Sequence, residues 1–130
     1  MKLIVVIGLT LVVLIGVLLV QPGSGQKQPE GNFQEVRTTI LANSGTLLDV
    51  RTPQEYAAGH IEEAENLSLQ DIQAGTAPNT PKDQPLYVYC QSGNRSAQAT
   101  ELLKSAGFQN VIDLGGIADV QASGGNITKP

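Results

Sequence analysis

The sequence is poor in cysteine, histidine and aromatic residues. Cys90 is the single cysteine and His60 the single histidine among 130 residues. One cysteine excludes an intramolecular disulfide framework and a multi-cysteine zinc or iron–sulfur site, and one histidine argues against the remaining kinds of zinc site. Two Phe, three Tyr and no Trp leave the core to Leu, Ile, Val and Ala. We therefore expect a small aliphatic core and no metal site.

Basic residues are also few. Eight Lys and Arg stand against 12 Asp and Glu, which gives a net charge of -4 at neutral pH. Because nucleic acids are bound by basic surfaces, this balance argues against nucleic acid as a partner. A chain of 130 residues also leaves room for only one domain.

Residues 3–20 form a long apolar run without a charged side chain. A helix of this length measures about 27 Å, close to the thickness of the bilayer hydrocarbon core. We predict that residues 1–20 form an uncleaved transmembrane anchor, because the run exceeds the roughly 7–15 apolar residues of a signal peptide and no A-x-A cleavage pattern follows it. The alternative is a cleaved signal peptide. Residues 21–31, rich in Gln, Pro, Gly and Ser, are predicted to be a flexible linker.

The charge beside the apolar run sets the expected orientation. Lys2 and the amino terminus lie on one side of the run, and the other side is mostly acidic. The positive-inside rule then places the N-terminus in the cytoplasm and the folded domain on the extracytoplasmic, periplasmic side, held by a single-pass membrane anchor. Cleavage would instead give a soluble periplasmic or secreted protein.

The rest of the chain alternates short apolar strands with helices. Strands are expected at 46–50, 86–90 and 111–114, with a further short strand beginning at 66–67, and helices at 33–41, 53–58, 69–73 and 96–106. Thr52, Pro53 and Glu55 fit an N-cap, a proline in the first turn and a capping box. The folded domain is predicted to span 32–120. A flexible tail is expected over 121–130, where apolar residues are few.

This alternation predicts a small parallel α/β sheet with helices packed against it. In such sheets ligands bind beyond the carboxyl ends of the strands. Three polar features are expected at those ends: Asp49 with Arg51, Cys90 with the loop after it, and the pair Gly115-Gly116. Asp49 and Arg51 are expected to form a structural ion pair at the rim of the pocket.

Cys90 ends a strand, and the segment after it leads directly into a helix. That segment consists of Gln91, Ser92, Gly93, Asn94 and Arg95, and the helix is expected to begin near Ser96. A strand, a tight loop with glycine and a helix start direct backbone N–H groups inward as an anion-binding nest. A thiol at its centre is stabilised as the thiolate, and the arginine adds positive charge. The loop therefore predicts a reactive cysteine rather than one that only fills the core.

Three segments together resemble the single-domain rhodanese family. They are DVRTPQEYAAGHIEEAENL at 49–67, YCQSGNRS at 89–96 and the glycines at 115–116, in this order and spacing. The likeness covers about residues 33–120 and is strongest to the small exported type of this family. It implies a rhodanese-like five-stranded parallel sheet with helices on both faces, and sulfurtransferase chemistry through a cysteine persulfide without metal or organic cofactor. In this resemblance Cys90 is the nucleophile and Gln91 to Ser96 form the substrate-binding loop.

The implied reaction moves a sulfane sulfur from a small donor such as thiosulfate to a thiol, or to cyanide in an assay. Two alternatives remain at this point. One is a non-catalytic rhodanese-like module that binds a partner protein. The other is a cysteine-dependent phosphatase or arsenate reductase, which is disfavoured because those phosphatases place five residues between cysteine and arginine, whereas four separate Cys90 from Arg95.

Overall fold

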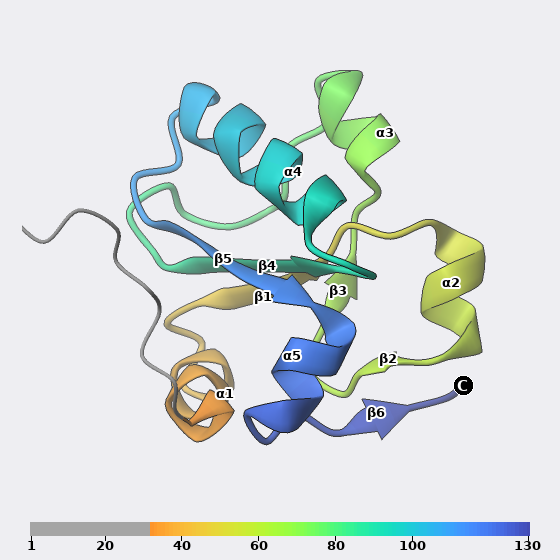
Figure 1. Ribbon diagram of the computed structural model, residues 1–130. Coiled ribbons are helices and arrows are strands. Elements are labelled where there is room, and N and C mark those ends of the chain that lie inside the picture. The colour runs from red at the N-terminus through yellow and green to blue at the C-terminus, as the bar shows by residue number, and fades with distance from the viewer. Residues whose placement is uncertain (1–31) are drawn as a thin grey trace, which may run out of the picture.

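The computed structural model describes residues 32–130, coloured in Figure 1. In chain order its elements are α1 (Phe33–Leu41), β1 (Thr46–Asp49), α2 (Pro53–Ala58), β2 (His60–Ile61), β3 (Glu65–Asn66), α3 (Leu69–Gln73), β4 (Leu86–Cys90), α4 (Asn94–Ser105), β5 (Val111–Gly116), α5 (Ile117–Ala122) and β6 (Ile127–Thr128). The predicted anchor at 1–20 and linker at 21–31 lie outside the described residues. Between residues 32 and 130, no helix combines the length and apolar character that a membrane crossing requires.

Four strands form a parallel sheet in the order β3-β1-β4-β5. The predicted parallel α/β sheet is confirmed, but the expectation of five strands is wrong for the described residues. The segment at 60–61 pairs antiparallel with β6 instead of joining the sheet. Only residues 62–64 separate β2 from β3. Since parallel neighbours need a crossover of about a dozen residues, β2 cannot lie beside β3 as a parallel strand.

The carboxyl-terminal segment is ordered by backbone hydrogen bonds. The prediction of a flexible tail over 121–130 is therefore wrong, because α5 extends to Ala122 and β6 pairs with β2. The N–H of Glu62 donates to the carbonyl of Asn126 over 3.0 Å, and the N–H of Phe33 donates to the carbonyl of Ser123 over 2.9 Å. Composition could not reveal these contacts, because every residue type carries the main-chain groups that make them.

Helices cover both faces of the parallel sheet, as predicted. In Figure 1, α3 and α4 lie on one face, α1 and α5 lie on the other, and α2 lies beside the ends of the strands. Alternate side chains of each strand enter the two cores. Leu48 and Val88 pack in the core under α4, while Leu47 and Tyr89 pack in the core on the side of α1 and α5. Both faces of β1 and β4 are thus buried, and their polar chemistry is confined to the strand ends.

The helix after the cysteine begins earlier than predicted. Helix α4 starts at Asn94 rather than Ser96, and Gly93 before it has a φ of 97°. A left-handed backbone of this kind costs glycine little, so the chain turns from β4 into α4 within three residues. Ala99 and Leu103 of this helix are buried, whereas Leu102 is 38% exposed.

Candidate active site

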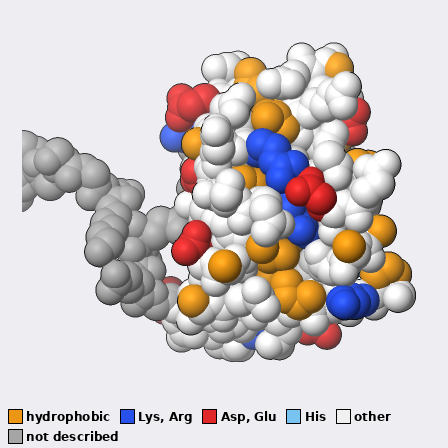
Figure 2. Space-filling view, turned by 45° about the vertical axis from the view of Figure 1, so that its right-hand side comes forward, with side chains coloured by type: hydrophobic (Ala, Val, Ile, Leu, Met, Phe, Trp, Pro, Cys, Tyr) orange, Lys and Arg blue, Asp and Glu red, His pale blue; other side chains and the backbone are white. Residues whose placement is uncertain are grey.

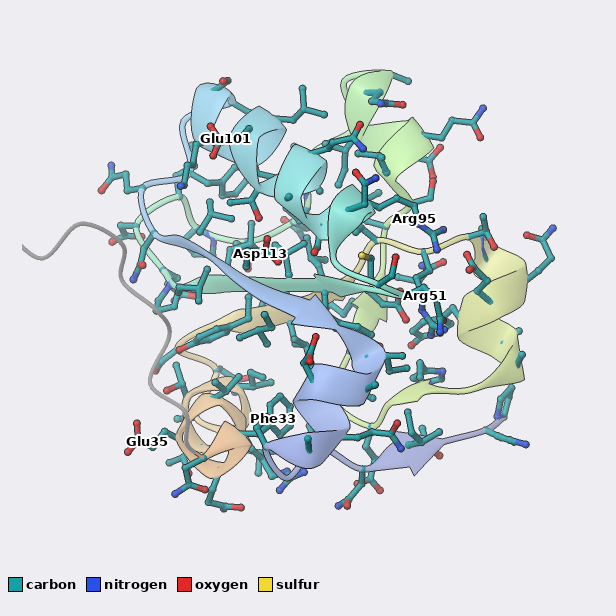
Figure 3. The ribbon with its side chains drawn as sticks, in the orientation of Figure 1. Phe33, Glu35, Arg51, Arg95, Glu101 and Asp113 are labelled. Carbon is teal, nitrogen blue, oxygen red and sulfur yellow. The ribbon has the colours of Figure 1, made fainter. Side chains whose placement is uncertain are left out.

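The carboxyl ends of β1, β4 and β5 meet at one edge of the sheet. Asp49 pairs with Tyr89, and Cys90 pairs with Gly116, so the ends of the three strands are in register. Helix α2 lies beside this edge, and α4 begins there (Figure 1). Figure 3 places Arg51 and Arg95 at the same edge, on the side of α2. The features that the sequence places at strand ends are therefore neighbours in space.

Cys90 is buried, with its sulfur among backbone N–H groups. The residue is 0% exposed, and the N–H of Gly93 donates a hydrogen bond to Sγ over 3.0 Å. Burial raises the pKa of the Cys90 thiol, but hydrogen bonds from the loop and the start of α4 outweigh burial, so the pKa lies below its usual value. The donors are the hydroxyl of Ser96 and the amides of Ser92, Gly93 and Ser96. The sulfur is therefore held as an anion at a lower pH than an ordinary cysteine.

The Ser96 hydroxyl has two partners. Its side chain is fully buried, and Oγ donates to the carbonyl of Gly93 over 3.0 Å. The same Oγ lies 3.4 Å from the carbonyl oxygen of Gly115, and the Ser96 side chain is among the groups that lower the pKa of the Cys90 thiol. A serine hydroxyl carries one proton, so it can turn from the carbonyl to the sulfur when the thiolate forms. Ser96 thus stabilises the anion without bringing a charge of its own.

Alkylation of Cys90 by iodoacetamide is expected to follow pH with a midpoint below the ordinary cysteine pKa of about 8.5. Only the thiolate reacts. The alkylation rate is therefore highest at pH values above the lowered pKa of the Cys90 thiol, and it declines as the pH falls through that pKa. Ser96→Ala removes one donor and should move the midpoint upward. Initial rates followed by intact mass give both midpoints. A wild-type midpoint equal to that of free cysteine would contradict the stabilisation by the loop.

The glycine pair at the end of β5 allows the cysteine loop to approach that strand. A Cβ on Gly116 would lie 2.8 Å from the carbonyl oxygen of Gln91 and 3.3 Å from Cα of Ser92. Gly115 has a φ of 82°, and a Cβ there would lie 3.0 Å from a carboxylate oxygen of Asp119. A side chain at Gly116 would therefore displace the cysteine loop, and one at Gly115 would be strained by its left-handed backbone.

Arg95 is held by a carboxylate from another helix. Its Nη1 and Nη2 lie 2.7 and 2.9 Å from the two carboxylate oxygens of Glu55 on α2. This two-point contact lowers the pKa of Glu55 to about 2 and raises the pKa of Arg95. Basic and acidic side chains adjoin in the middle of the face shown in Figure 2, which includes this edge of the sheet. The pair stays ionised at any pH where the thiolate is present.

Glu55 is a site residue that the sequence identified only as part of a helix cap. It does serve that role, because its Oε2 accepts from the Thr52 N–H over 3.0 Å and its own N–H donates to the Thr52 hydroxyl. The same carboxylate then reaches Arg95, 40 residues further along the chain. No sequence pattern links two residues so far apart, so only the fold could reveal the pair.

Asp49 and Arg51 form a buried ion pair. Asp49 is 0% and Arg51 4% exposed, and Nη2 lies 2.7 Å from Oδ2. The Tyr89 hydroxyl donates to the same carboxylate oxygen over 2.7 Å, and Arg51 donates to the carbonyl of Gly59 over 2.7 Å. Burial, together with the Asp49 charge, raises the pKa of Tyr89, so its hydroxyl keeps its proton and remains a donor. This network joins the end of β1 to β4 and to the chain after α2.

The two amide side chains of the loop make different contacts. The Gln91 carbonyl oxygen accepts from Nη1 of Arg51 over 3.3 Å, which links the cysteine loop to the buried ion pair. The Asn94 carbonyl oxygen accepts from the amide of Gln98, one turn along α4, over 2.9 Å. Both residues are exposed. Gln91 therefore borders the site, whereas Asn94 is directed along its own helix.

The site provides one nucleophile, the Cys90 sulfur, within an anion-binding loop made largely of main-chain N–H groups. Within residues 32–130, no three His, Cys, Asp or Glu side chains come together as a metal site would require. His60 stacks on Tyr56 with ring centroids 3.6 Å apart, and its Nδ1 lies 2.8 Å from the Tyr56 carbonyl oxygen. Because N–H groups surround the Cys90 sulfur, this edge of the sheet is suited to an anionic sulfur species.

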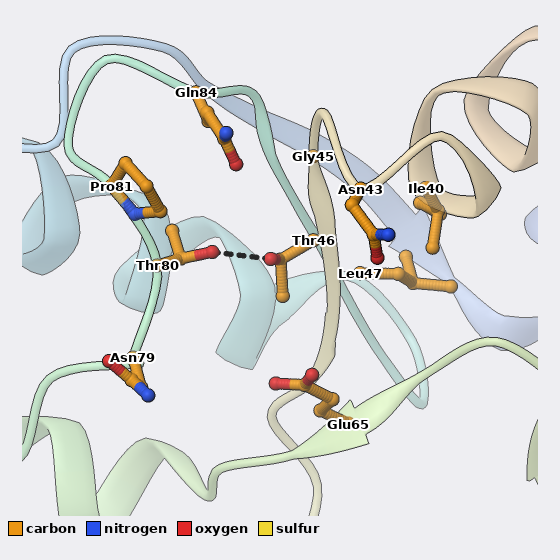
Figure 4. A pocket seen from close by; sticks show the side chains of 10 residues that line it. All are labelled: Ile40, Asn43, Gly45, Thr46, Leu47, Glu65, Asn79, Thr80, Pro81 and Gln84. Atoms are coloured by element: carbon orange, nitrogen blue, oxygen red, sulfur yellow. Dashed lines mark hydrogen bonds between the residues drawn. The ribbon is translucent and has the colours of Figure 1, made fainter.

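A hollow of about 330 Å³ lies away from the cysteine (Figure 4). The residues that line it are Ile40, Asn43, Gly45, Thr46, Leu47, Glu65, Asn79, Thr80, Pro81 and Gln84. The hydroxyls of Thr46 and Thr80 are hydrogen-bonded to each other. Since Thr46 begins β1 and Cys90 ends β4, the hollow lies at the opposite end of the parallel sheet from Cys90.

Comparisons with known proteins point to one family. Residues 33–123 match the model of the rhodanese-like domain. The chain is 35% identical over 74 residues to thiosulfate sulfurtransferase PspE of Escherichia coli, which covers 56% of this chain and 71% of that protein. It is 37% identical over 82 residues to thiosulfate sulfurtransferase GlpE of Pseudomonas entomophila, covering 63% and 74%. A solved E. coli rhodanese with anions superposes with a TM-score of 0.56 at 30% identity, covering 66% of this chain and 99% of that one.

Proposed function

Because this chain belongs to the rhodanese-like sulfurtransferase family, we propose that it moves a sulfane sulfur from a donor such as thiosulfate to a thiol or cyanide through a persulfide on Cys90. The observation that carries the proposal is the hydrogen bond from the Gly93 N–H to the Cys90 sulfur, 3.0 Å long. Relatives named as thiosulfate sulfurtransferases, and a related E. coli rhodanese solved with anions, support the same chemistry.

The proposed reaction has two steps that share the cysteine. The Cys90 thiolate attacks the outer sulfur of thiosulfate, the sulfur–sulfur bond of the donor breaks, and sulfite leaves with the electron pair. The enzyme then holds Cys90–S–S⁻. Cyanide attacks the outer sulfur in turn, thiocyanate leaves, and the thiolate is restored. Charge and sulfur balance in each step, and no other reactant is needed.

The loop is suited to the persulfide as well as to the thiolate. The outer sulfur lies about 2 Å beyond Sγ and carries the negative charge. Inward N–H groups and the amino-terminal dipole of α4, a helix of 12 residues, stabilise an anion at that place. Because Cys90 is 0% exposed, the exposed side chains of the loop must move aside to admit a donor.

The contacts of Arg95 weigh against the phosphatase alternative. A phosphatase loop needs its arginine free to clamp the oxygens of a tetrahedral anion. Here both terminal nitrogens of Arg95 are engaged by Glu55, at 2.7 and 2.9 Å. The buried thiol with a lowered pKa weighs against the binding module, because a module that only docks a partner gains nothing from a stabilised thiolate.

Treatment of the full-length protein with thiosulfate is expected to add about 32 Da, one sulfur atom held as the covalent intermediate. Fragmentation should place the gain on the peptide that contains Cys90. Cyanide should then remove the added mass and release thiocyanate in equal amount. No mass gain with any sulfane donor, together with hydrolysis of p-nitrophenyl phosphate, would favour the phosphatase. No gain and no hydrolysis would leave the binding module.

A further inference from the structure

Strand β5 contains a bulge just before it reaches the cysteine. Asp113 and Gly115 pair with consecutive residues of β4, so Leu114 between them is an extra residue in β5. Bulges between parallel strands are rare, and bulges often lie next to active sites, where they redirect the chain. Beyond the bulge Gly116 pairs with Cys90, whereas in an unbroken register Gly115 would stand there. The bulge therefore decides which part of β5 lies beside the cysteine.

The carboxylate of Asp113 contacts the backbone of this bulge. Asp113 pairs with Val88, which packs in the core under α4, so its half-buried side chain lies on the α4 face of β5. Figure 3 shows it there, between α4 and the sheet. Its Oδ1 accepts from the Gly115 N–H over 2.9 Å. Because a bulge disrupts the ladder locally, a main-chain N–H at the bulge needs another acceptor, and the side chain two residues earlier provides it.

Gly115 lies against two of the groups that donate to the Cys90 sulfur. The first is Gly93, whose N–H donates to Sγ, and a Cβ added to Gly93 would come within 3.8 Å of Cα of Gly115. The second is Ser96, whose Oγ lies 3.4 Å from the Gly115 carbonyl oxygen. The turn at Gly93 and the start of α4 therefore adjoin the backbone of Gly115, and a shift of that backbone would move both donors.

We propose that Asp113 is a positioning residue for the anion site around Cys90. Its carboxylate holds the Gly115 N–H, which fixes β5 in the bulged register where Gly115 supports Gly93 and Ser96. Loss of the acceptor frees β5 to shift along β4, and the two donors then move away from the sulfur. The inference concerns the site of the proposed function, but it depends on the Cys90 thiolate alone and not on sulfur transfer.

Three substitutions at position 113 separate the hydrogen bond from the charge. Asp113→Asn keeps an accepting oxygen at the same reach and removes the charge. Asp113→Glu keeps the charge but places it one carbon further out, where the two-residue turn to the Gly115 N–H no longer fits. Asp113→Ala removes both. Every variant keeps the ionised side chains that join β1, α2, α4 and β5 at this edge, which are Asp49, Arg51, Glu55, Arg95 and Asp119.

Alkylation of the full-length protein by iodoacetamide, followed by intact mass as a function of pH, gives the readout. Asp113→Ala and Asp113→Glu should move the midpoint of the alkylation rate upward by roughly 0.5 to 1 unit, which corresponds to weakening one hydrogen bond to the anion. Asp113→Asn should leave the midpoint at or below that of the wild type. At pH values above all the midpoints the rates should converge, because every Cys90 sulfur is then a thiolate.

The loss of a similar hydrogen bond elsewhere provides the control. Asn32→Ala removes the side-chain oxygen that accepts from the Gln34 N–H over 3.3 Å at the start of α1. Helix α1 lies on the other face of the sheet from α4 (Figure 1), so the midpoint for Cys90 should not move. The thermal midpoint of each variant records what the substitution costs the fold.

The outcomes at position 113 decide the inference. An unmoved alkylation midpoint in Asp113→Ala and Asp113→Glu would overturn it, and so would an upward shift in Asp113→Asn equal to theirs. The same shift in Asn32→Ala would mean that lost stability alone moves the midpoint, and would also overturn it. If Asp113→Ala does not fold, Asp113→Glu and Asp113→Asn still give the comparison. Sulfur loading of the wild type by thiosulfate tests the proposed function separately, so each can fail while the other stands.

Discussion

Cys90→Ser is expected to abolish sulfur transfer, with turnover reduced by at least about 10⁴-fold. A hydroxyl at this position has no readily formed anion near neutral pH, and an oxygen nucleophile cannot form the persulfide that carries the sulfur between the two half-reactions. No other thiol can substitute, since Cys90 is the only cysteine of the chain. Thiocyanate formation from thiosulfate and cyanide measures the loss, and intact mass should show no added sulfur.

The same substitution should leave the fold in place. Serine has nearly the volume of cysteine, and its oxygen can still accept from the Gly93 N–H that now meets the sulfur at 3.0 Å. The thermal midpoint should therefore stay close to that of the wild type, which separates lost chemistry from lost structure. Residual turnover in Cys90→Ser would mean that sulfur travels by another route.

Asp49→Asn is expected to destabilise the fold by about 3–5 kcal/mol, because it leaves the Arg51 charge buried without a counter-ion. Arg51 is 4% exposed, and its Nη2 lies 2.7 Å from the carboxylate oxygen that also accepts from Tyr89. An asparagine would keep one accepting oxygen but would turn its NH₂ group toward the donors that now face the second carboxylate oxygen. The thermal midpoint should fall by roughly 15 °C or more for a domain of this size, and urea unfolding should show a lower midpoint at an unchanged slope.

An exposed ion pair offers the matched control. Glu101 and Lys104 on α4 lie 3.6 Å apart with side chains 77% and 52% exposed, and Figure 3 places Glu101 far along α4 from Arg95. Glu101→Gln should cost less than about 0.5 kcal/mol. Arg51→Met added to Asp49→Asn should restore part of the stability, since it removes the unpaired charge. Equal losses in Asp49→Asn and Glu101→Gln would mean that the buried pair contributes no more than a surface pair.

Local chemistry made much of the fold predictable. The capping box at Thr52, Pro53 and Glu55 starts α2 as predicted, because the residues that make it are adjacent in sequence. The strands at 46–49 and 86–90 follow from short apolar runs that can only be buried on both faces. The resemblance to the single-domain rhodanese family is confirmed, and the family match spans residues 33–123.

The features that escaped prediction depend on contacts between distant segments. Pairing of β2 with β6 joins residues near 60 to residues near 127 through main-chain bonds, which composition does not record. The contact of Arg95 with Glu55 crosses 40 residues. The glycines at 115–116 were recognised from the family pattern, but their physical reason, the close approach of the Gln91 carbonyl to Gly116, required coordinates.

Strand β6 makes residues 123–130 part of the folded domain, so trimming them would carry a structural cost. Thr128 lies opposite His60 in the antiparallel pair, and Lys129 reaches Gly59, whose carbonyl accepts from Arg51. A deletion from residue 123 onward would remove the partner of β2 and disturb the backbone against which that guanidinium is positioned. Engineered versions of this protein should therefore keep residues 123–130.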